Sequence, residues 1–76
     1  MLTITINTDL YKRHNYLTNT ELANLIKQKH LRTIDSSNIS RALRGISKSY
    51  VVHYCLCDVL NLDLDKVFIV KNGAND

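Results

Sequence analysis

The segment Asp35–Gly45 constrains the fold most, because the sequence marks both ends of a short helix in it. Ile34 and Ile39 flank Asp35 as the apolar pair of a hydrophobic staple, which predicts Asp35 as the N-cap. Gly45 stands where a helix ends. The side chains that then share one apolar face at helical spacing are Ile39, Ala42 and Leu43.

The opposite face of this predicted helix is polar and cationic and holds no acidic side chain. Short hydroxyl and amide groups and arginines can reach base edges and phosphates in the major groove of DNA. A solvated face without a ligand is the alternative. The residues on this face are Ser36, Ser37, Asn38, Ser40, Arg41 and Arg44.

The length of 76 residues predicts a single domain. A chain this short buries only about 60% of its unfolded surface, so we expect a small core and no deep enzyme pocket. Its hydrophobic content of 45% is ordinary for a globular protein. No apolar run approaches the roughly 20 residues of a membrane span, and no signal-peptide pattern opens the chain. We therefore expect a soluble, cytoplasmic protein.

Charge is divided unevenly along the chain. Residues 1–50 carry eight lysines and arginines against three acids, a net charge of +5. Residues 51–76 carry two lysines against four acids, a net charge of −2. A basic majority and an acidic end suggest one face for a polyanion, although small basic domains without such a role are common.

Short strands are predicted near both termini. Leu2–Ile6 alternates apolar and polar residues, which predicts a strand whose apolar side chains Leu2, Ile4 and Ile6 face inward. The other candidate is Val67–Val70. The two strands could pair with each other, or their edges could pair across a dimer axis.

Three further helices are indicated around the central one. Asp9–Leu17 is a weak helix with Thr8 as its cap, and its inward residues would be Leu10, His14 and Leu17. Thr18 and Glu21 form a capping box that opens a helix running to about His30. The core positions expected for this second helix are Leu22, Ala23, Leu25 and Ile26, and a connection follows over Leu31–Ile34.

A staple-and-cap signal of Ile46, Ser47 and Val51 opens the next helix, which runs to about Leu60. Asn61 tolerates the left-handed conformation of a helix end. Asp63, between Leu62 and Val67, caps one further turn at Leu64–Phe68. The inward residues expected after Ser47 are Val51, Val52, Cys55, Leu56, Val59 and Leu60.

The residues that could support other chemistry are few. Cys55 and Cys57 point away from each other on a helix, so we expect buried, reduced thiols. His14, His30 and His53 do not converge with them as metal ligands, and no catalytic set or glycine-rich phosphate loop is present. We expect no enzyme, no metal and no cofactor. The four tyrosines, which could form a stacking platform for single-stranded nucleic acid, are Tyr11, Tyr16, Tyr50 and Tyr54. Tyr50 and Tyr54 lie one turn apart and are better suited to the core or to a dimer surface.

Three motifs in order carry a family resemblance. Leu17–Ala23 resembles the opening of the second helix in the Cro/CI family of phage and bacterial helix-turn-helix repressors. Ile39–Gly45 is similar to the end of that family's recognition helix, and Val59–Phe68 to the close of its five-helix domain. The predicted fold class is therefore mainly α, a small helix-turn-helix domain of four to five short helices with a short β-strand at each terminus. Its parts would be a strand arm at 1–7, a helical core at 8–68, a C-terminal strand at 67–71 and a frayed tail at 72–76.

The resemblance implies a dimer that reads a double-stranded operator with the helix Asp35–Gly45 in the major groove. It implies phosphate contacts at Asn19 and Thr20, before the recognition helix. The base-facing positions would be Ser36, Ser37, Asn38 and Arg41, with Ser40 on the same helix and with Arg44 and Lys48 against phosphates. Helix-start chemistry is the alternative role of Ser36 and Ser37.

The chain departs from the family pattern in one spacing. Sixteen positions separate Ala23 from Ile39, roughly six more than the pattern has. These residues could lengthen the first helix of the pair by about 9 Å and turn its exit, or they could form a loop. In a loop, Lys27, Lys29 and Arg32 would add phosphate contacts.

Two functions from different classes follow. The first is a DNA-binding transcriptional regulator of Cro/repressor type. The second is an antirepressor that binds a partner repressor protein, to which an altered motif, an acidic second half and an exposed strand edge are suited. The dependence of affinity on salt separates them, because phosphate contacts weaken steeply as salt rises.

Overall fold

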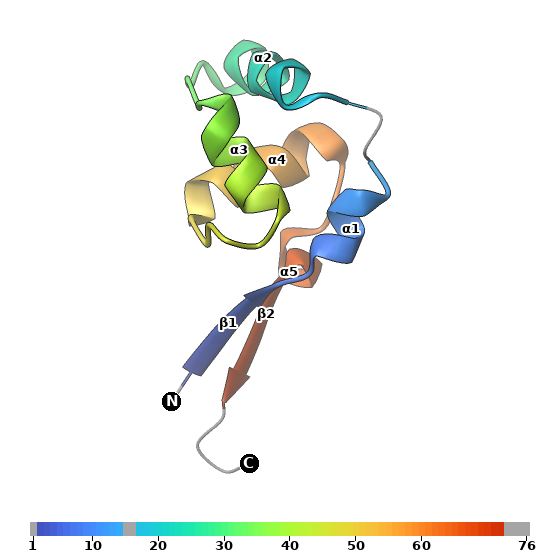
Figure 1. Ribbon diagram of the computed structural model, residues 1–76, viewed down its shortest axis with the longest axis vertical. Helices are drawn as coiled ribbons and strands as arrows, with labels where there is room; N and C mark the ends of the chain where they lie inside the picture. Colours follow the sequence, from blue (N-terminus) through green and yellow to red (C-terminus); the bar gives the residue numbers. More distant parts are fainter. Residues whose placement is uncertain (1, 15–16, 73–76) are drawn as a thin grey trace.

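The computed structural model describes residues 2–14 and 17–72 and has the predicted mainly α architecture with a strand at each end (Figure 1). No helix among these residues has the length and apolarity needed to cross a membrane. Residues 73–76 of the predicted frayed tail lie outside the described residues. The elements are β1 (Leu2–Ile6), α1 (Thr8–Lys12), α2 (Asn19–His30), α3 (Ser36–Leu43), α4 (Tyr50–Leu60), α5 (Leu64–Val67) and β2 (Phe68–Asn72).

The two terminal strands pair with each other. β1 and β2 form an antiparallel two-stranded ribbon in a register that places Ile6 opposite Phe68 and Ile4 opposite Val70. Of the two pairings open from sequence, the structure has the one within the chain. We call β1 and β2 together the terminal ribbon.

The prediction that all three apolar residues of β1 face the core is wrong for two of them. Ile6 is 6% exposed, whereas Ile4 is 41% and Leu2 is 69% exposed. The three side chains share one face of the strand, but the ribbon extends away from the helices (Figure 1), so only its inner end meets the core.

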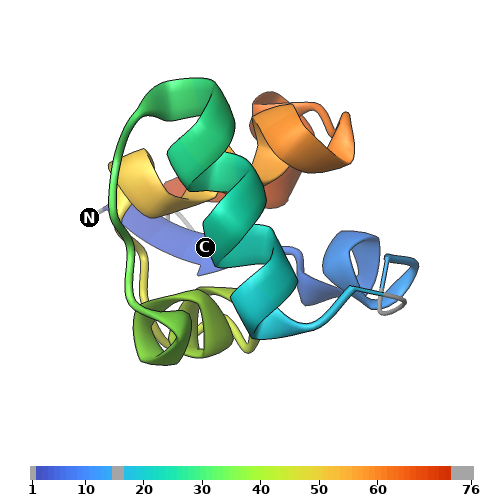
Figure 2. The same cartoon turned by 90° about the horizontal axis from the view of Figure 1, so that it is seen from above.

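Helices α2, α3 and α4 enclose the core. Leu22 and Ile26 of α2, Ile39 of α3 and Leu56 of α4 are at most 1% exposed. Seen from above, α2 runs diagonally across the front of the molecule and covers part of α4, while α3 lies to one side of it (Figure 2). The predicted core position Leu25 is wrong, since its side chain is 37% exposed.

The first helix is shorter than predicted and has a different buried face. It begins at Thr8 after an N-cap at Asn7 and ends at Lys12, and its buried residue is Tyr11. Leu10 and His14 are half-buried. The remainder of the predicted helix includes residues 15–16, which lie outside the described residues.

Helix ends follow the predicted capping signals in several places. Thr18 Oγ1 accepts from the Glu21 amide, and Glu21 Oε1 accepts from the Thr18 amide, each at 3.1 Å. Asn61 ends α4 in the left-handed region at φ 60°, and Asp63 caps α5 by accepting from the Asp65 amide. The side-chain chemistry of these caps is local, which is why the sequence reveals it.

The start of α4 was predicted too early. The helix begins at Tyr50 with Ser49 as N-cap, not at Ser47. The proposed staple is wrong, because Ile46 and Val51 are 62% and 42% exposed. Cys55 and Cys57 are buried free thiols, as predicted.

A buried polar network joins the loop before α4 to α1. His53 is fully buried and contacts the Ser47 carbonyl through Nε2 at 2.7 Å and the Tyr11 hydroxyl through Nδ1 at 2.5 Å. The Tyr11 oxygen also lies 3.8 Å from Cys57 Sγ. Phe68 packs edge-on against the imidazole, at 5.2 Å between ring centroids. The network holds the chain that follows α3 against α1 and α4.

Candidate nucleic-acid interface

Helix α3 has the boundaries that its sequence predicts. Asp35 is the N-cap in an extended conformation, and the staple residues Ile34 and Ile39 are buried. Asp35 therefore occupies the predicted N-cap position, but its side chain accepts no hydrogen bond from the helix amides. Gly45 has φ +79°, and a Cβ there would lie 3.1 Å from Thr8 Cγ2, which explains the need for glycine after α3.

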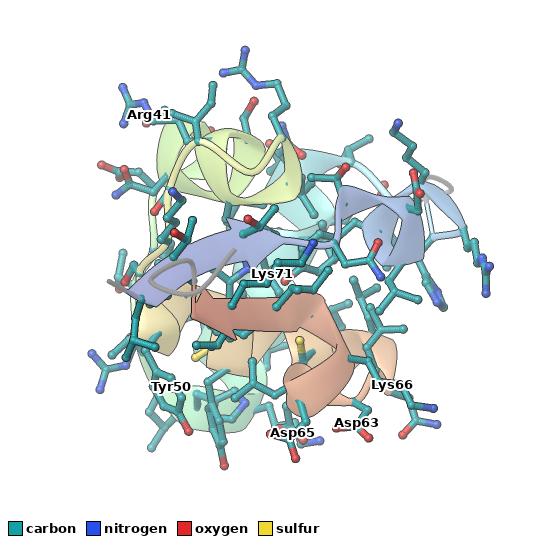
Figure 3. All side chains as sticks on the ribbon, turned by 90° about the horizontal axis from the view of Figure 1, so that it is seen from below. Arg41, Tyr50, Asp63, Asp65, Lys66 and Lys71 are labelled. Atoms are coloured by element: carbon teal, nitrogen blue, oxygen red, sulfur yellow. The ribbon has the colours of Figure 1, made fainter. Side chains whose placement is uncertain are left out.

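The outward face of α3 is exposed and free of acidic side chains. Ile39 and Ala42 are fully buried on the opposite face and fix the rotation of the helix about its axis. Figure 3 shows Arg41 extending from α3 into solvent on the side away from Tyr50. The exposed residues of this face are Ser36, Ser37, Asn38, Arg41 and Arg44, and Ser40 is half-buried.

Two arginines of α3 are held by neighbours on the same helix. Arg41 donates from its guanidinium to Asn38 Oδ1 at 3.0 Å, one turn back. Arg44 donates from Nε to the Ser40 carbonyl at 3.4 Å, near the C-terminal end where a cation is favoured. Each arginine keeps further N–H donors for a ligand, because a guanidinium carries five.

The start of α2 lies close to the end of α3. Asn19 and Leu43 line the same pocket, and Thr20 is exposed on the first turn of α2, next to Asn19. The capping box at this helix start already bonds the Thr18 and Glu21 amides, so Asn19 and Thr20 offer their side chains there. Asn19 and Thr20 therefore lie next to the end of α3.

Lys48 is separate from this group. Because α4 begins late, Lys48 belongs to the loop before it, where it lines a groove with Tyr50 and Asp65. The other predicted site residues thus lie on α3, at its end and on the first turn of α2, whereas Lys48 lines the groove with Tyr50 and Asp65.

The residues between Ala23 and Ile39 form both of the predicted alternatives, a longer helix and a loop. Helix α2 continues to His30, and Leu31 then ends it in the left-handed region at φ 54°. A connection without regular secondary structure leads from there to Asp35. The added residues therefore lengthen the helix and also form a loop.

The added part of α2 is bound to α4. Lys29 Nζ and His30 Nε2 lie 3.1 and 2.7 Å from the same Asp58 carboxylate oxygen. The Lys29 ammonium is the main cause that lowers the pKa of Asp58, and His30 adds to it. Lys29 is thereby engaged within the protein, while Lys27 and Arg32 are exposed.

An aromatic row on α4 is the largest feature that the sequence left undecided. Tyr50 stacks on Phe68 and on Tyr54 at 6.1 Å between centroids in each case, and His30 meets Tyr54 edge-on. Tyr50 and Tyr54 are 62% and 49% exposed, so the interpretation as core residues is wrong. Tyr11 is buried, which removes it from any shared platform, and Tyr16 lies outside the described residues.

Residues missed by the sequence interpretation are Tyr11, His53 and Cys57. Their spacing gives only a weak signal, since His53 and Cys57 stand one turn apart on α4 and Tyr11 is distant in sequence. Across residues 2–14 and 17–72, no group of three or more histidine, cysteine, aspartate or glutamate side chains could hold a metal ion.

Comparison with known proteins gives no relative: no family model, curated protein or solved structure matches the chain.

Proposed function

We propose that the protein is a transcriptional regulator of Cro/repressor type that binds double-stranded DNA with α3 in the major groove. The observation that carries the proposal is the outward face of α3, which is exposed, cationic and free of acids, and is backed by the buried Ile39 and Ala42. Hydroxyl, amide and guanidinium groups are the side chains that pair with base edges and phosphates.

Arg41 is the side chain expected to read a base. Its contact with Asn38 limits the rotamers it must lose on binding, and its fork can pair with the O6 and N7 atoms of guanine. Asn38, Ser36 and Ser37 lie on the same face and supply the adjoining contacts. Arg44 and the first turn of α2, with Asn19 and Thr20, would position the helix on phosphates.

The overall charge favours the same ligand. The chain carries +3 at neutral pH and has a pI of about 9.0. The acidic residues of the second half do not belong to α3, so they leave its face attractive to a polyanion. The three motifs that resemble the Cro/CI family agree with this assignment.

The test is selection of a duplex from a random library, followed by binding of the selected duplex by variants. Arg41→Ala should lose roughly 1–3 kcal/mol of affinity, concentrated at one base position, because a bidentate base contact is removed. Arg41→Lys keeps the charge without the fork, so it should retain non-specific affinity and lose preference at that position.

Lys66→Ala is the matched control, since it also removes one positive charge but lies on the side of the molecule away from Arg41 (Figure 3). It should leave base preference unchanged. Equal affinity and equal base preference in wild type, Arg41→Ala and Lys66→Ala would refute the role of α3.

Binding to a partner repressor is the second candidate, and the exposed aromatic row of Tyr50 and Tyr54 favours it. A partner complex of this kind would survive high salt, whereas phosphate contacts would lose orders of magnitude in affinity. Co-purification of a regulator at high salt, with no duplex binding at low salt, would select this function over the first.

A further inference from the structure

A second surface of the molecule lies between the terminal ribbon and the start of α4. It is a groove of about 390 Å³, here called the apolar groove, and α5 forms its remaining wall. Most of its lining is aliphatic or aromatic. The lining residues are Ile4, Lys48, Tyr50, Leu64, Asp65, Phe68 and Val70.

Three of the apolar side chains that line the groove, Ile4, Tyr50 and Val70, are exposed, and Leu64 and Phe68 are half-buried. Ile4 and Val70 face each other across the ribbon and are 41% and 57% exposed. Tyr50 is held by its stack on Phe68, with an angle of 17° between the rings. A fixed aromatic ring beside exposed aliphatic groups is the composition found at the centre of protein interfaces. Leaving such a patch in water costs free energy that a docked surface would recover.

The two charges of the groove indicate what docks there. Lys48 and Asp65 are its charged lining residues, one of each sign. A nucleic acid would gain from Lys48 but be repelled by Asp65, and a strongly basic or acidic peptide would meet the same conflict. In a two-fold interface, every contact between two different residues occurs twice, because each copy contributes each of the two residues once. Lys48 of one copy can then pair with Asp65 of the other, twice.

We propose that the apolar groove is the contact surface of a homodimer, centred on Tyr50, Ile4 and Val70 and oriented by two reciprocal Lys48–Asp65 pairs. A stable interface needs about 800 Å² from each partner, which is about 15% of the chain's accessible surface of 5229 Å². Exposed residues that border the groove extend it, with Leu2 on the same ribbon face and Val51 and Tyr54 beside Tyr50. The dimer goes beyond the proposed function, since it stands whether or not α3 binds DNA.

The first experiment measures mass by sedimentation equilibrium from micromolar to millimolar concentration. Wild type should approach twice 8.7 kDa. Val70→Lys places a charge on the groove face and should raise the dimer dissociation constant at least tenfold. Thr5→Lys is the matched control, because Thr5 is exposed on the opposite face of the ribbon and its variant should dimerise like wild type. Circular dichroism establishes that both variants are folded.

The second experiment tests the reciprocal pairing. Lys48→Asp alone puts two acids opposite each other at both pairs, and Asp65→Lys alone puts two lysines there, so each variant should be monomeric. In a mixture of the two variants, every pair again joins opposite charges, and a heterodimer should form. Restored dimerisation in the mixture distinguishes this interface from any surface in which the two residues do not meet.

Three results would overturn the inference. The first is a wild-type monomer at millimolar concentration, including one that binds a different protein through Tyr50. The second is a Val70→Lys dimer as strong as that of Thr5→Lys. The third is a mixture of the charge variants that stays monomeric while wild type dimerises. None of these results bears on Arg41 and the selected duplex, so the dimer and the DNA site can fail separately.

Discussion

His53 shows how one buried residue organises its neighbours. The Ser47 carbonyl can only accept a hydrogen bond, so His53 Nε2 carries the proton and donates to it. Nδ1 is then an acceptor and receives the Tyr11 hydroxyl proton, which leaves the Cys57 thiol as donor to the Tyr11 oxygen. Each hydrogen bond in this network has one donor and one acceptor only while the imidazole is neutral. Burial raises the pKa values of Tyr11 and Cys57, which keeps both groups protonated.

Acid should therefore destabilise the protein through His53. Burial lowers the pKa of His53 in the folded protein, although the Ser47 carbonyl partly opposes the shift. The unfolded chain keeps the ordinary pKa of about 6.5 and takes up a proton that the folded state resists. The contribution to the free energy of unfolding is thus complete above about pH 6.5 and falls as the pH drops from there toward the lowered pKa. Urea unfolding across this range measures the slope.

Two variants separate His53 from other titrating groups. His53→Gln should lose the part of the slope that this imidazole supplies. Tyr11→Phe keeps the buried imidazole and should retain that slope, while the unpaired Nδ1 lowers stability at every pH by about 1–3 kcal/mol. An identical slope in wild type and His53→Gln would contradict the assignment.

At the scale of elements, the start of α2 depends on a reciprocal cap. Thr18→Ala removes the acceptor of the Glu21 amide and should lower the free energy of unfolding by about 1 kcal/mol. Thr20→Ala makes the same substitution two residues on, at an exposed position inside the helix, and should change stability little. Denaturant midpoints of the two variants provide the comparison, and equal loss in both would argue against the cap.

The same scale shows which parts of the fold the sequence can predict. The starts of α2 and α5 and the ends of α3 and α4 were predictable, because a side-chain cap, a glycine or an asparagine acts within a few residues of the helix end. The start of α4 was not, since Ser47 and Ser49 are both plausible caps. The choice depends on the Ser47 carbonyl bonding to His53, a contact that appears only when the loop is packed.

The candidate site divides in the same way. The face of α3 was predictable from helical spacing, and its backing residues Ile39 and Ala42 are buried as expected. The position of Lys48 was not, because it follows from the late start of α4. The apolar groove was also hidden, since the exposure of Ile4 depends on how far the terminal ribbon extends past the helices.

At the scale of the whole molecule, two surfaces of different chemistry lie on opposite sides. Figure 3 shows Arg41 on one side and Tyr50, with Asp63 and Asp65, on the other. One surface is cationic and polar, and the other is aromatic with acids around it. A ligand on the apolar groove therefore leaves α3 open, and binding at the two surfaces can occur together.

This arrangement predicts how a dimer formed through the groove would meet DNA. A two-fold axis lies within the interface it relates, so a face directed away from that interface is turned to the opposite direction in the second copy. The two α3 helices would then point outward and could not enter adjacent major grooves of one duplex. An immobilised duplex should retain a second, labelled duplex when wild type is present, and Val70→Lys should abolish retention while still binding each duplex. Binding of one dimer across a single palindrome would contradict this geometry.

The consequence is a tether between two DNA sites that forms only above a certain protein concentration. Below the dimer dissociation constant, each monomer would occupy its own stretch of DNA and the stretches would move independently. Above it, two occupied stretches would be joined back to back, closing a loop between distant sites on one molecule. Two sites on the same DNA molecule meet far more often than sites on separate molecules, and how often they meet depends on their spacing. The spacing of the two sites along the DNA would therefore set the protein concentration at which the loop closes.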